Sequence, residues 1–368
     1  MKFIKNLIKY IMIKNKDNLI CFYSESSFYT NYYLDLAKAL KINGENLLIL
    51  TSCLKEYNKL KKDFEIIFIG DGFFRYLIFN ILKSKCLIMT LTDIGNNLFK
   101  SKFCKSYIYY FHAMASTHKI YTNTAFDNYD IILSLGDFQN KEIRIREKKF
   151  NLKRKKIYNT GYFYLDYLKK NTNKGSSKED IILFAPSWNY NNKNLLNDHG
   201  DNIIKELISQ NLKVIFRPHP QNFLKNKEII ENINKKYSSN SYTLDQSPSN
   251  IRSMEEAGSL VTDNSAISLE YSFNFHRPVF FIDYSDKIHN KNYLDIDLEP
   301  IENLFKKNIG FNLKLSEINL VEKNIKKFYK NINHYKNLDE KFLNENYFYN
   351  NDSVQKTLYM FKKDNLIQ

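Results

Sequence analysis

The amino-acid sequence predicts an α/β protein with two domains, each built around a parallel β-sheet. The chain has 368 residues, which is more than one hydrophobic core usually supports. Short apolar runs alternate with helical patterns along most of its length, as they do where crossover helices join parallel strands. Residues 170–180 contain no apolar side chain and separate two such alternating series. We therefore expect this segment to link the domains.

In the first series, apolar runs bounded by polar or turn-forming residues predict strands. They cover residues 19–23, 46–51, 65–69, 86–90, 106–111, 130–135 and 156–160. Helical periodicity predicts helices over residues 29–42, 73–82 and 137–148. The first of these is expected to end at Asn43-Gly44, because glycine readily adopts the left-handed conformation that closes a helix.

The second series repeats the alternation. Its predicted strands cover residues 180–184, 213–216, 241–244, 259–261 and 278–282. Its predicted helices cover residues 202–209, 223–235, 249–256, 265–273 and 315–329. No G-x-G-x-x-G motif follows the first strand of the chain, and no G-x-x-x-x-G-K-[ST] motif occurs anywhere. The sequence therefore disfavours a dinucleotide-dependent dehydrogenase and a P-loop NTPase.

Four segments result from this pattern. They are an amphipathic N-terminal helix at residues 1–16, an N-terminal domain at 17–170, a C-terminal domain at 171–345 and a C-terminal helix at 346–368. The last helix either packs back on the N-terminal domain or stands apart from it. The two parallel sheets are expected to face each other across a cleft, because phosphorylated ligands commonly bind beyond the carboxyl ends of such strands.

Composition excludes several classes of protein. Hydrophobic residues make up 43% of the chain, which excludes intrinsic disorder as its main state. No apolar run approaches the length of a membrane-spanning helix, which excludes an integral membrane protein. Lys and Arg number 55 against 40 Asp and Glu, so the net charge is +15 and favours anionic partners. The lysines are dispersed and no nucleic-acid-binding motif occurs, so we expect no nucleic-acid partner.

The N-terminal helix suggests one of these anionic partners. Its apolar residues share one face of a helix, namely Phe3, Ile4, Leu7, Ile8 and Ile11. Lysines flank this stripe, as in helices that lie on an anionic membrane surface. Packing of the helix on its own domain is the alternative, and the sequence leaves both open.

Four cysteines without C-x-x-C spacing indicate a reducing compartment, so the expected location is cytoplasmic, at the inner face of the cell membrane.

Polar residues at predicted strand ends mark the candidate site in the second half. Arg217 and His219 directly follow an apolar strand, and the prolines beside them stiffen the turn. Arginine forms forked contacts with phosphate oxygens, and histidine can add a donor. Ser187 and Trp188 follow another strand and are expected to line the cleft.

A strand that runs into a helix supplies the next group. It contains Thr262, Asp263, Asn264 and Ser265, with Glu270 one turn further on. The free N–H groups and the positive end of the helix dipole can bind a diphosphate there, and Glu270 can accept hydrogen bonds from a ribose diol. An ordinary capped helix with a solvated glutamate is the alternative.

In the first half, His112 emerges directly after an apolar strand, where it can act as a general base near neutral pH. His118 lies six residues further on and can contact phosphate or support the base. Asp93 ends another apolar strand and is a candidate for acceptor binding. No paired histidines or D-x-D motif accompany these residues, so we expect no metal and no cofactor.

Together these motifs resemble the CDP-glycerol glycerophosphotransferase family, the teichoic-acid and capsule polymerases of GT-B fold. The resemblance covers about residues 105–285. It lies in the order and spacing of His112, Gly161-Tyr162 with Asp166, Ala185-Pro186-Ser187-Trp188, Arg217-Pro218-His219-Pro220, Thr262-Asp263-Asn264-Ser265 and Arg277-Pro278-Val279. The family usually has His-Gly where this chain has His112-Ala113, and a second serine where it has Ala266.

The resemblance implies two Rossmann-like domains, an acceptor domain followed by a nucleotide-donor domain. It implies transfer of a glycerophosphate or related polyol-phosphate group from a CDP-linked donor to a lipid-linked surface-glycan or teichoic-acid-like acceptor. His112 would be the catalytic base, and Arg217, His219 and Ser265 would hold the donor's phosphates. The alternatives are a GT-B glycosyltransferase that uses a nucleotide-activated sugar and, from another class, a non-catalytic nucleotide- or glycan-binding protein.

Overall fold

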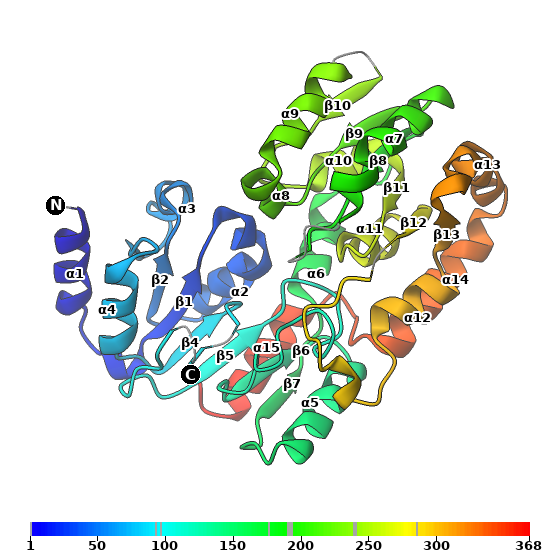
Figure 1. The fold of residues 1–368 in the computed structure, drawn as a ribbon. Helices are drawn as coiled ribbons and strands as arrows, with labels where there is room; N and C mark the ends of the chain where they lie inside the picture. Colours follow the sequence, from blue (N-terminus) through cyan, green and yellow to red (C-terminus); the bar gives the residue numbers. More distant parts are fainter. Residues whose placement is uncertain are drawn as a thin grey trace. The chain divides into compact units, whose positions relative to one another are not determined.

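The computed structural model contains two α/β units, as the sequence predicts (Figure 1). It describes residues 2–92, 94–95, 98–175, 177–189, 194–237, 241–284 and 286–368. Unit 1 comprises residues 1–112, 121–167 and 347–368. Unit 2 comprises residues 113–120 and 168–346. The chain therefore contributes two segments, 113–120 and 347–368, to a different unit from the residues just before them.

Unit 1 is built on a seven-stranded sheet in the order β3-β2-β1-β4-β5-β6-β7, and all its strand pairs are parallel. The strands are β1 (Ile20–Ser24), β2 (Leu47–Thr51), β3 (Ile66–Phe68), β4 (Cys86–Met89), β5 (Tyr107–Tyr110), β6 (Ile131–Ser134) and β7 (Lys156–Asn159). Each predicted strand of the first series is present. Five of the seven are buried throughout, because helices cover both faces of a parallel sheet.

The helices of unit 1 include two that the sequence analysis did not predict, α3 and α6. In chain order they are α1 (Lys2–Met12), α2 (Thr30–Ile42), α3 (Leu54–Leu60), α4 (Phe73–Ile81), α5 (Asp137–Lys149), α6 (Phe163–Asn171) and α15 (Ser353–Lys363). Helix α6 continues across the boundary between the units. Helix α15 adds Leu358 and Phe361 to the core that α2 forms with the sheet.

Unit 2 is built on a six-stranded parallel sheet in the order β10-β9-β8-β11-β12-β13. The strands are β8 (Lys178–Phe184), β9 (Lys213–Phe216), β10 (Tyr242–Leu244), β11 (Ala257–Thr262), β12 (Val279–Asp283) and β13 (Phe311–Lys314). The first five match the predicted strands. The sixth, β13, was missed because only Leu313 is fully buried in this edge strand, so it has no apolar run.

The helices of unit 2 are shorter than predicted in two places. They are α7 (Leu195–Ser209), α8 (Pro220–Lys225), α9 (Lys227–Lys236), α10 (Ile251–Glu256), α11 (Ile267–Phe275), α12 (Ile301–Asn308), α13 (Val321–Lys330) and α14 (Ile332–Asn346). The helix predicted at 223–235 is divided at Asn226. The one predicted at 315–329 begins with a 3-10 segment, Leu315–Leu320, before α13.

The C-terminal segment 347–368 is held in unit 1 by a close backbone approach. Gly161 has φ of +85°, and a Cβ atom there would lie 2.2 Å from the carbonyl oxygen of Phe348. Asp166 accepts a hydrogen bond of 2.8 Å from the backbone N–H of Ser353, at the start of α15. The Gly161-Tyr162 and Asp166 motif therefore has a structural explanation, since it seats the last helix.

We expect Gly161→Ala to destabilise unit 1 by about 2 kcal/mol or more, because a left-handed alanine is strained and its Cβ displaces the backbone of Phe348. Thermal unfolding measures the loss, and limited proteolysis shows whether residues 347–368 are released. Gly175→Ala is the matched control, since a Cβ there meets only Asn173, at 3.6 Å. Equal melting temperatures for the two variants would contradict this explanation.

Candidate active site

The order of strands in unit 2 reverses between β8 and β11, and ligands of such sheets bind beyond the carboxyl ends at this point. Ser187 follows β8 and Asp263 follows β11. The Asp263 carboxylate accepts hydrogen bonds of 2.8 Å from both the backbone N–H and the hydroxyl of Ser187. The Thr262 hydroxyl donates to the carbonyl of Ala185 at 2.6 Å. These buried contacts fix the two strand-end turns to each other.

Lysines surround Asp263, although the sequence analysis did not single them out. Lys306 donates a short hydrogen bond to the Asn264 side chain. Burial lowers the pKa of Lys306 and of Lys287, and the nearby charge of Asp263 opposes both shifts. Lys119 is fully buried and contacts Asp286 at 3.3 Å. This group of cations suits a ligand that carries several negative charges.

The sequence analysis missed the lysines because it searched only for polar residues that directly follow a predicted strand. Lys306 lies in α12, which has no predicted counterpart. Lys119 was passed over in favour of the neighbouring histidine. Lys287 lies four residues beyond the end of β12, so a wider search past each strand end would have found it.

An aromatic group lies beside this site. Trp188 follows β8, and its ring centroid is 5.8 Å from that of His219 and 5.4 Å from that of His289. Burial lowers the pKa of His289 to about 4, and the charge of Lys287 contributes to this shift, so the ring is neutral at neutral pH. His219 Nδ1 accepts from the backbone N–H of Gln221 at 3.1 Å, which leaves the neutral ring's proton on Nε2 as a donor.

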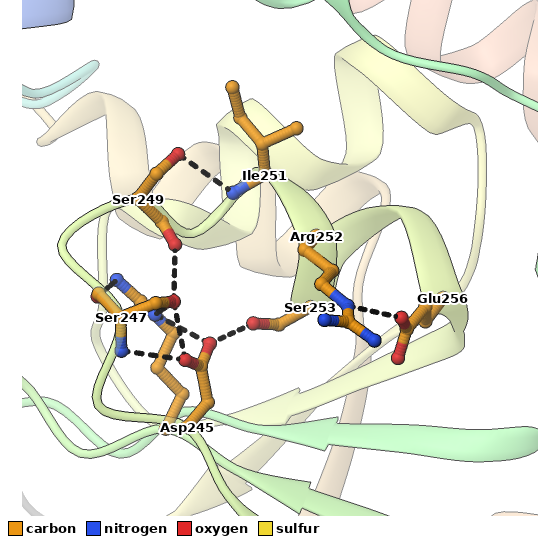
Figure 2. Close-up of polar contacts among 8 residues, drawn as sticks. Asp245, Ser247, Ser249, Ile251, Arg252, Ser253 and Glu256 are labelled. Carbon is orange, nitrogen blue, oxygen red and sulfur yellow. Dashed lines mark hydrogen bonds and ion pairs between the residues drawn. The ribbon is translucent and has the colours of Figure 1, made fainter.

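Arg217 is held by an ion pair that the sequence did not predict. Its guanidinium lies 2.5 Å from the Asp245 carboxylate and also contacts Ser247. Figure 2 shows Asp245 between Ser247 and Ser253, both of which donate hydrogen bonds to it. Burial alone would raise the pKa of Asp245, but these hydrogen bonds and the arginine charge outweigh it and lower the pKa. Much of the charge of Arg217 is therefore already balanced.

Two other predicted residues, His118 and Glu270, are buried. His118 belongs to unit 2, and its Nε2 donates to the backbone carbonyl of Leu298 at 3.1 Å. Asn290 donates to the carbonyl of His118 at 2.8 Å, so the segment 113–120 is pinned along residues 290–298. Glu270 is buried within α11. Ser265 is half-buried, two residues before α11 begins.

In unit 1, His112 is half-buried at the carboxyl end of β5. Its Nδ1 lies 2.5 Å from the hydroxyl of Thr90, which directly follows the neighbouring strand β4. The rings of Tyr29 and Tyr121 approach His112 edge-on, at centroid distances of 5.2 and 6.1 Å. The imidazole is thus held in a fixed orientation by one hydrogen bond and two aromatic contacts.

Asp93, the candidate for acceptor binding, lies outside the described residues. Among the described residues, no group of three or more His, Cys, Asp or Glu side chains is arranged to hold a metal ion. In the same part of the chain, no helix has the length and apolar character that a membrane span requires.

Two parallel α/β units, with cations gathered beyond the strand ends of the second, give the protein the GT-B fold. The chain belongs to the CDP-glycerol:poly(glycerophosphate) glycerophosphotransferase family, whose sequence profile matches residues 5–340. It is thus an enzyme of that family, which transfers glycerophosphate from a CDP-linked donor to a teichoic-acid-type acceptor. The resemblance seen in the sequence is confirmed.

Solved structures support the same fold. The wall teichoic acid polymerase TagF is similar over 98% of this chain and 95% of its own, with a TM-score of 0.59 at 17% identity. A UDP-GlcNAc 2-epimerase from Methanocaldococcus jannaschii is similar over 94% of this chain and 99% of its own, with a TM-score of 0.57 at 13% identity. A putative epimerase from Listeria monocytogenes gives a TM-score of 0.57 at 12% identity, over 95% and 96% of the two chains. No curated protein matched the sequence.

We expect Lys306→Met to weaken the binding of CDP by about ten-fold, because it removes a partly buried cation beside Asn264. Isothermal titration calorimetry at two salt concentrations measures the affinity and its dependence on charge. Lys307→Met is the matched control, since Lys307 is exposed on the same helix. Equal affinities for the two variants would exclude Lys306 from the anion site.

Proposed function

We propose that His112 is the general base that deprotonates the acceptor hydroxyl during glycerophosphate transfer. The observation that carries this proposal is the contact of 2.5 Å between His112 Nδ1 and the Thr90 hydroxyl. When Nδ1–H donates to the Thr90 oxygen, Nε2 carries the lone pair that accepts a proton. In this proposal Thr90 is a positioning residue whose hydroxyl oxygen accepts from Nδ1–H.

The transfer then proceeds as a displacement at the donor's β-phosphorus. The acceptor oxygen forms a bond to this phosphorus while the acceptor proton passes to His112 Nε2. The bond from the phosphorus to the bridging oxygen breaks, and CMP leaves with the electron pair. Cations near the leaving phosphate stabilise the charge that develops on it.

Unit 2 supplies these cations in our proposal. Lys287 and Lys306 flank Asp263 and hold the donor's diphosphate, together with Asn264 and Ser265. His219 donates from Nε2 to a phosphate oxygen. Trp188 offers a surface against which the cytosine base stacks, as aromatic side chains commonly do with bases. Arg217 contributes less to the binding of the diphosphate, because Asp245 already offsets its charge.

We expect His112→Ala to lower kcat by roughly 10²- to 10⁴-fold, the usual effect of losing a general base. The affinity for CDP-glycerol should stay within about two-fold of wild type, because the proposed donor contacts are untouched. CMP release with a glycerophosphate acceptor measures turnover, and calorimetry with CDP-glycerol measures binding.

The matched control for this experiment is His334→Ala, an exposed histidine on α14. It should retain both turnover and binding. Loss of CDP-glycerol binding in His112→Ala would mean that His112 contacts the donor instead. Full turnover in His112→Ala would remove it from the mechanism altogether.

We further propose that α1 holds the enzyme at an anionic membrane surface, where a lipid-linked acceptor would be found. One side of the helix packs on unit 1, because the hydroxyl of the buried Tyr10 contacts the carbonyl of Ile81 and the backbone N–H of Lys83. Ile8, Ile11 and Met12 are 50%, 59% and 74% exposed. Exposed apolar residues beside lysines are typical of helices that lie at a lipid interface.

Replacing both Ile8 and Ile11 by Asp should weaken binding to vesicles of anionic phospholipid by about ten-fold or more, since two apolar side chains no longer enter the bilayer. Tyr10 and its contacts remain, so unit 1 should keep its melting temperature. Cosedimentation with vesicles measures binding. Ile42→Asp changes an isoleucine that is 85% exposed elsewhere in unit 1 and serves as the control. Equal cosedimentation of the double variant and this control would refute membrane binding through α1.

A further inference from the structure

A cluster of polar side chains at the carboxyl end of the first sheet has no role in the chemistry proposed above. Glu25 directly follows β1, Ser52 directly follows β2, and Arg75 lies in the first turn of α4. Arg75 Nη1 lies 3.6 Å from a carboxylate oxygen of Glu25 and 3.5 Å from the hydroxyl of Tyr23. That hydroxyl is 3.0 Å from the hydroxyl of Ser52. All of these residues belong to unit 1.

The cluster lies where a sheet of this type binds ligands. The strand order of unit 1 reverses between β1 and β4, and ligands bind beyond the carboxyl ends at such a reversal. Glu25 stands on the β1 side of this point. Thr90, which orients His112, stands on the β4 side. The cluster and the proposed base thus share one sheet edge.

The loop after β1 connects the cluster with the base. The Tyr29 ring in this loop contacts His112, at a centroid distance of 5.2 Å. Burial raises the pKa of Tyr29 to about 12, and the charge of Glu25 adds to this shift. Two strand spacings separate β1 from β5, or roughly 10 Å. A short stretch of an acceptor chain spans this distance.

The guanidinium of Arg75 is less firmly bound than those of other partly buried arginines. Arg217 makes an ion pair of 2.5 Å, and Arg277 donates to four backbone carbonyls at 2.8 to 3.0 Å. Besides the two long contacts given above, Arg75 interacts with the side chain of Tyr76, whose ring centroid lies 5.4 Å from the guanidinium carbon. Its buried Nε makes no hydrogen bond among the described residues. An incoming phosphate could therefore offer Nη1 shorter hydrogen bonds than the 3.5 and 3.6 Å contacts that the protein provides.

We propose that Arg75 binds a phosphodiester of the acceptor, while Glu25 accepts a hydrogen bond from a neighbouring glycerol hydroxyl. This proposal rests on the proposed function, in which His112 deprotonates a hydroxyl of a polyol-phosphate acceptor. The cluster then determines specificity, because it favours phosphate-bearing chains over neutral glycans. It also places the last hydroxyl of such a chain toward His112.

The test uses the full-length protein and two acceptors, a short glycerophosphate oligomer and a neutral glycosylated glycerol. Arg75→Met should weaken oligomer binding, and raise the oligomer's KM, by about ten-fold or more. The KM for the neutral acceptor and the affinity for CDP-glycerol should not change. Arg75→Lys should recover part of the loss, and Glu25→Gln should cause a smaller loss than Arg75→Met. Arg154→Met, at an exposed position of unit 1, should behave as wild type.

Unchanged oligomer binding in Arg75→Met would overturn the subsite. An equal loss for the neutral acceptor or for CDP-glycerol would also overturn it, because the effect would then be structural. Failure of the proposed function gives a different result. If wild type binds the oligomer through Arg75 but transfers no glycerophosphate to it from CDP-glycerol, the subsite stands and the proposed function falls.

Discussion

The geometry of the second unit depends on one buried carboxylate, that of Asp263. Its two hydrogen bonds to Ser187 join the turn after β8 to the turn after β11, the strands between which the order of the sheet reverses. A buried carboxylate costs free energy unless hydrogen bonds and nearby cations compensate it. Lys287 and Lys306 supply that compensation. The residue that fixes the backbone of the site therefore also requires the cations that can hold a diphosphate.

Those lysines are close to balanced by carboxylates before any ligand binds. Asp263, Asp286 and Glu302 lie among Lys119, Lys287 and Lys306. Burial raises the pKa of Glu302 and lowers that of Lys287 and Lys306, so these three charges are held away from water at a cost. An anionic ligand gains most where cations have already lost their hydration. The protein thus prepares the site through the burial of its cations rather than through an excess of positive charge.

The sequence predicted the strands better than it predicted which side chains form hydrogen bonds and ion pairs with each other. The strands of unit 1 appear as predicted because parallel strands buried on both faces read as continuous apolar runs. Strand-end residues such as His112 and Asp263 follow from the same pattern. The partner of Arg217, however, lies 28 residues away, and that of His118 lies 180 residues away. Such pairings depend on tertiary packing, which leaves no periodic signal. Lys306 was not predicted as a site residue for the same reason, because its contact with Asn264 also depends on tertiary packing.

The first unit also joins its strand ends through a buried carboxylate, but hydroxyl groups compensate this charge instead of cations. The absence of cations around it, in the part of the chain that the structure describes, suits the chemistry proposed for this unit. Glu56 is fully buried, and its carboxylate ties the ends of β1 and β2 to the start of α2. It accepts hydrogen bonds from the hydroxyls of Ser24, Thr30, Tyr33 and Thr51. Among the described residues, no lysine or arginine contacts it. Nearby positive charge would disfavour protonation of an imidazole, whereas a phosphate site requires such charge. Hydroxyls beside His112 and lysines beside Asp263 therefore fit a division in which the first unit accepts the proton and the second unit holds the phosphates of the donor.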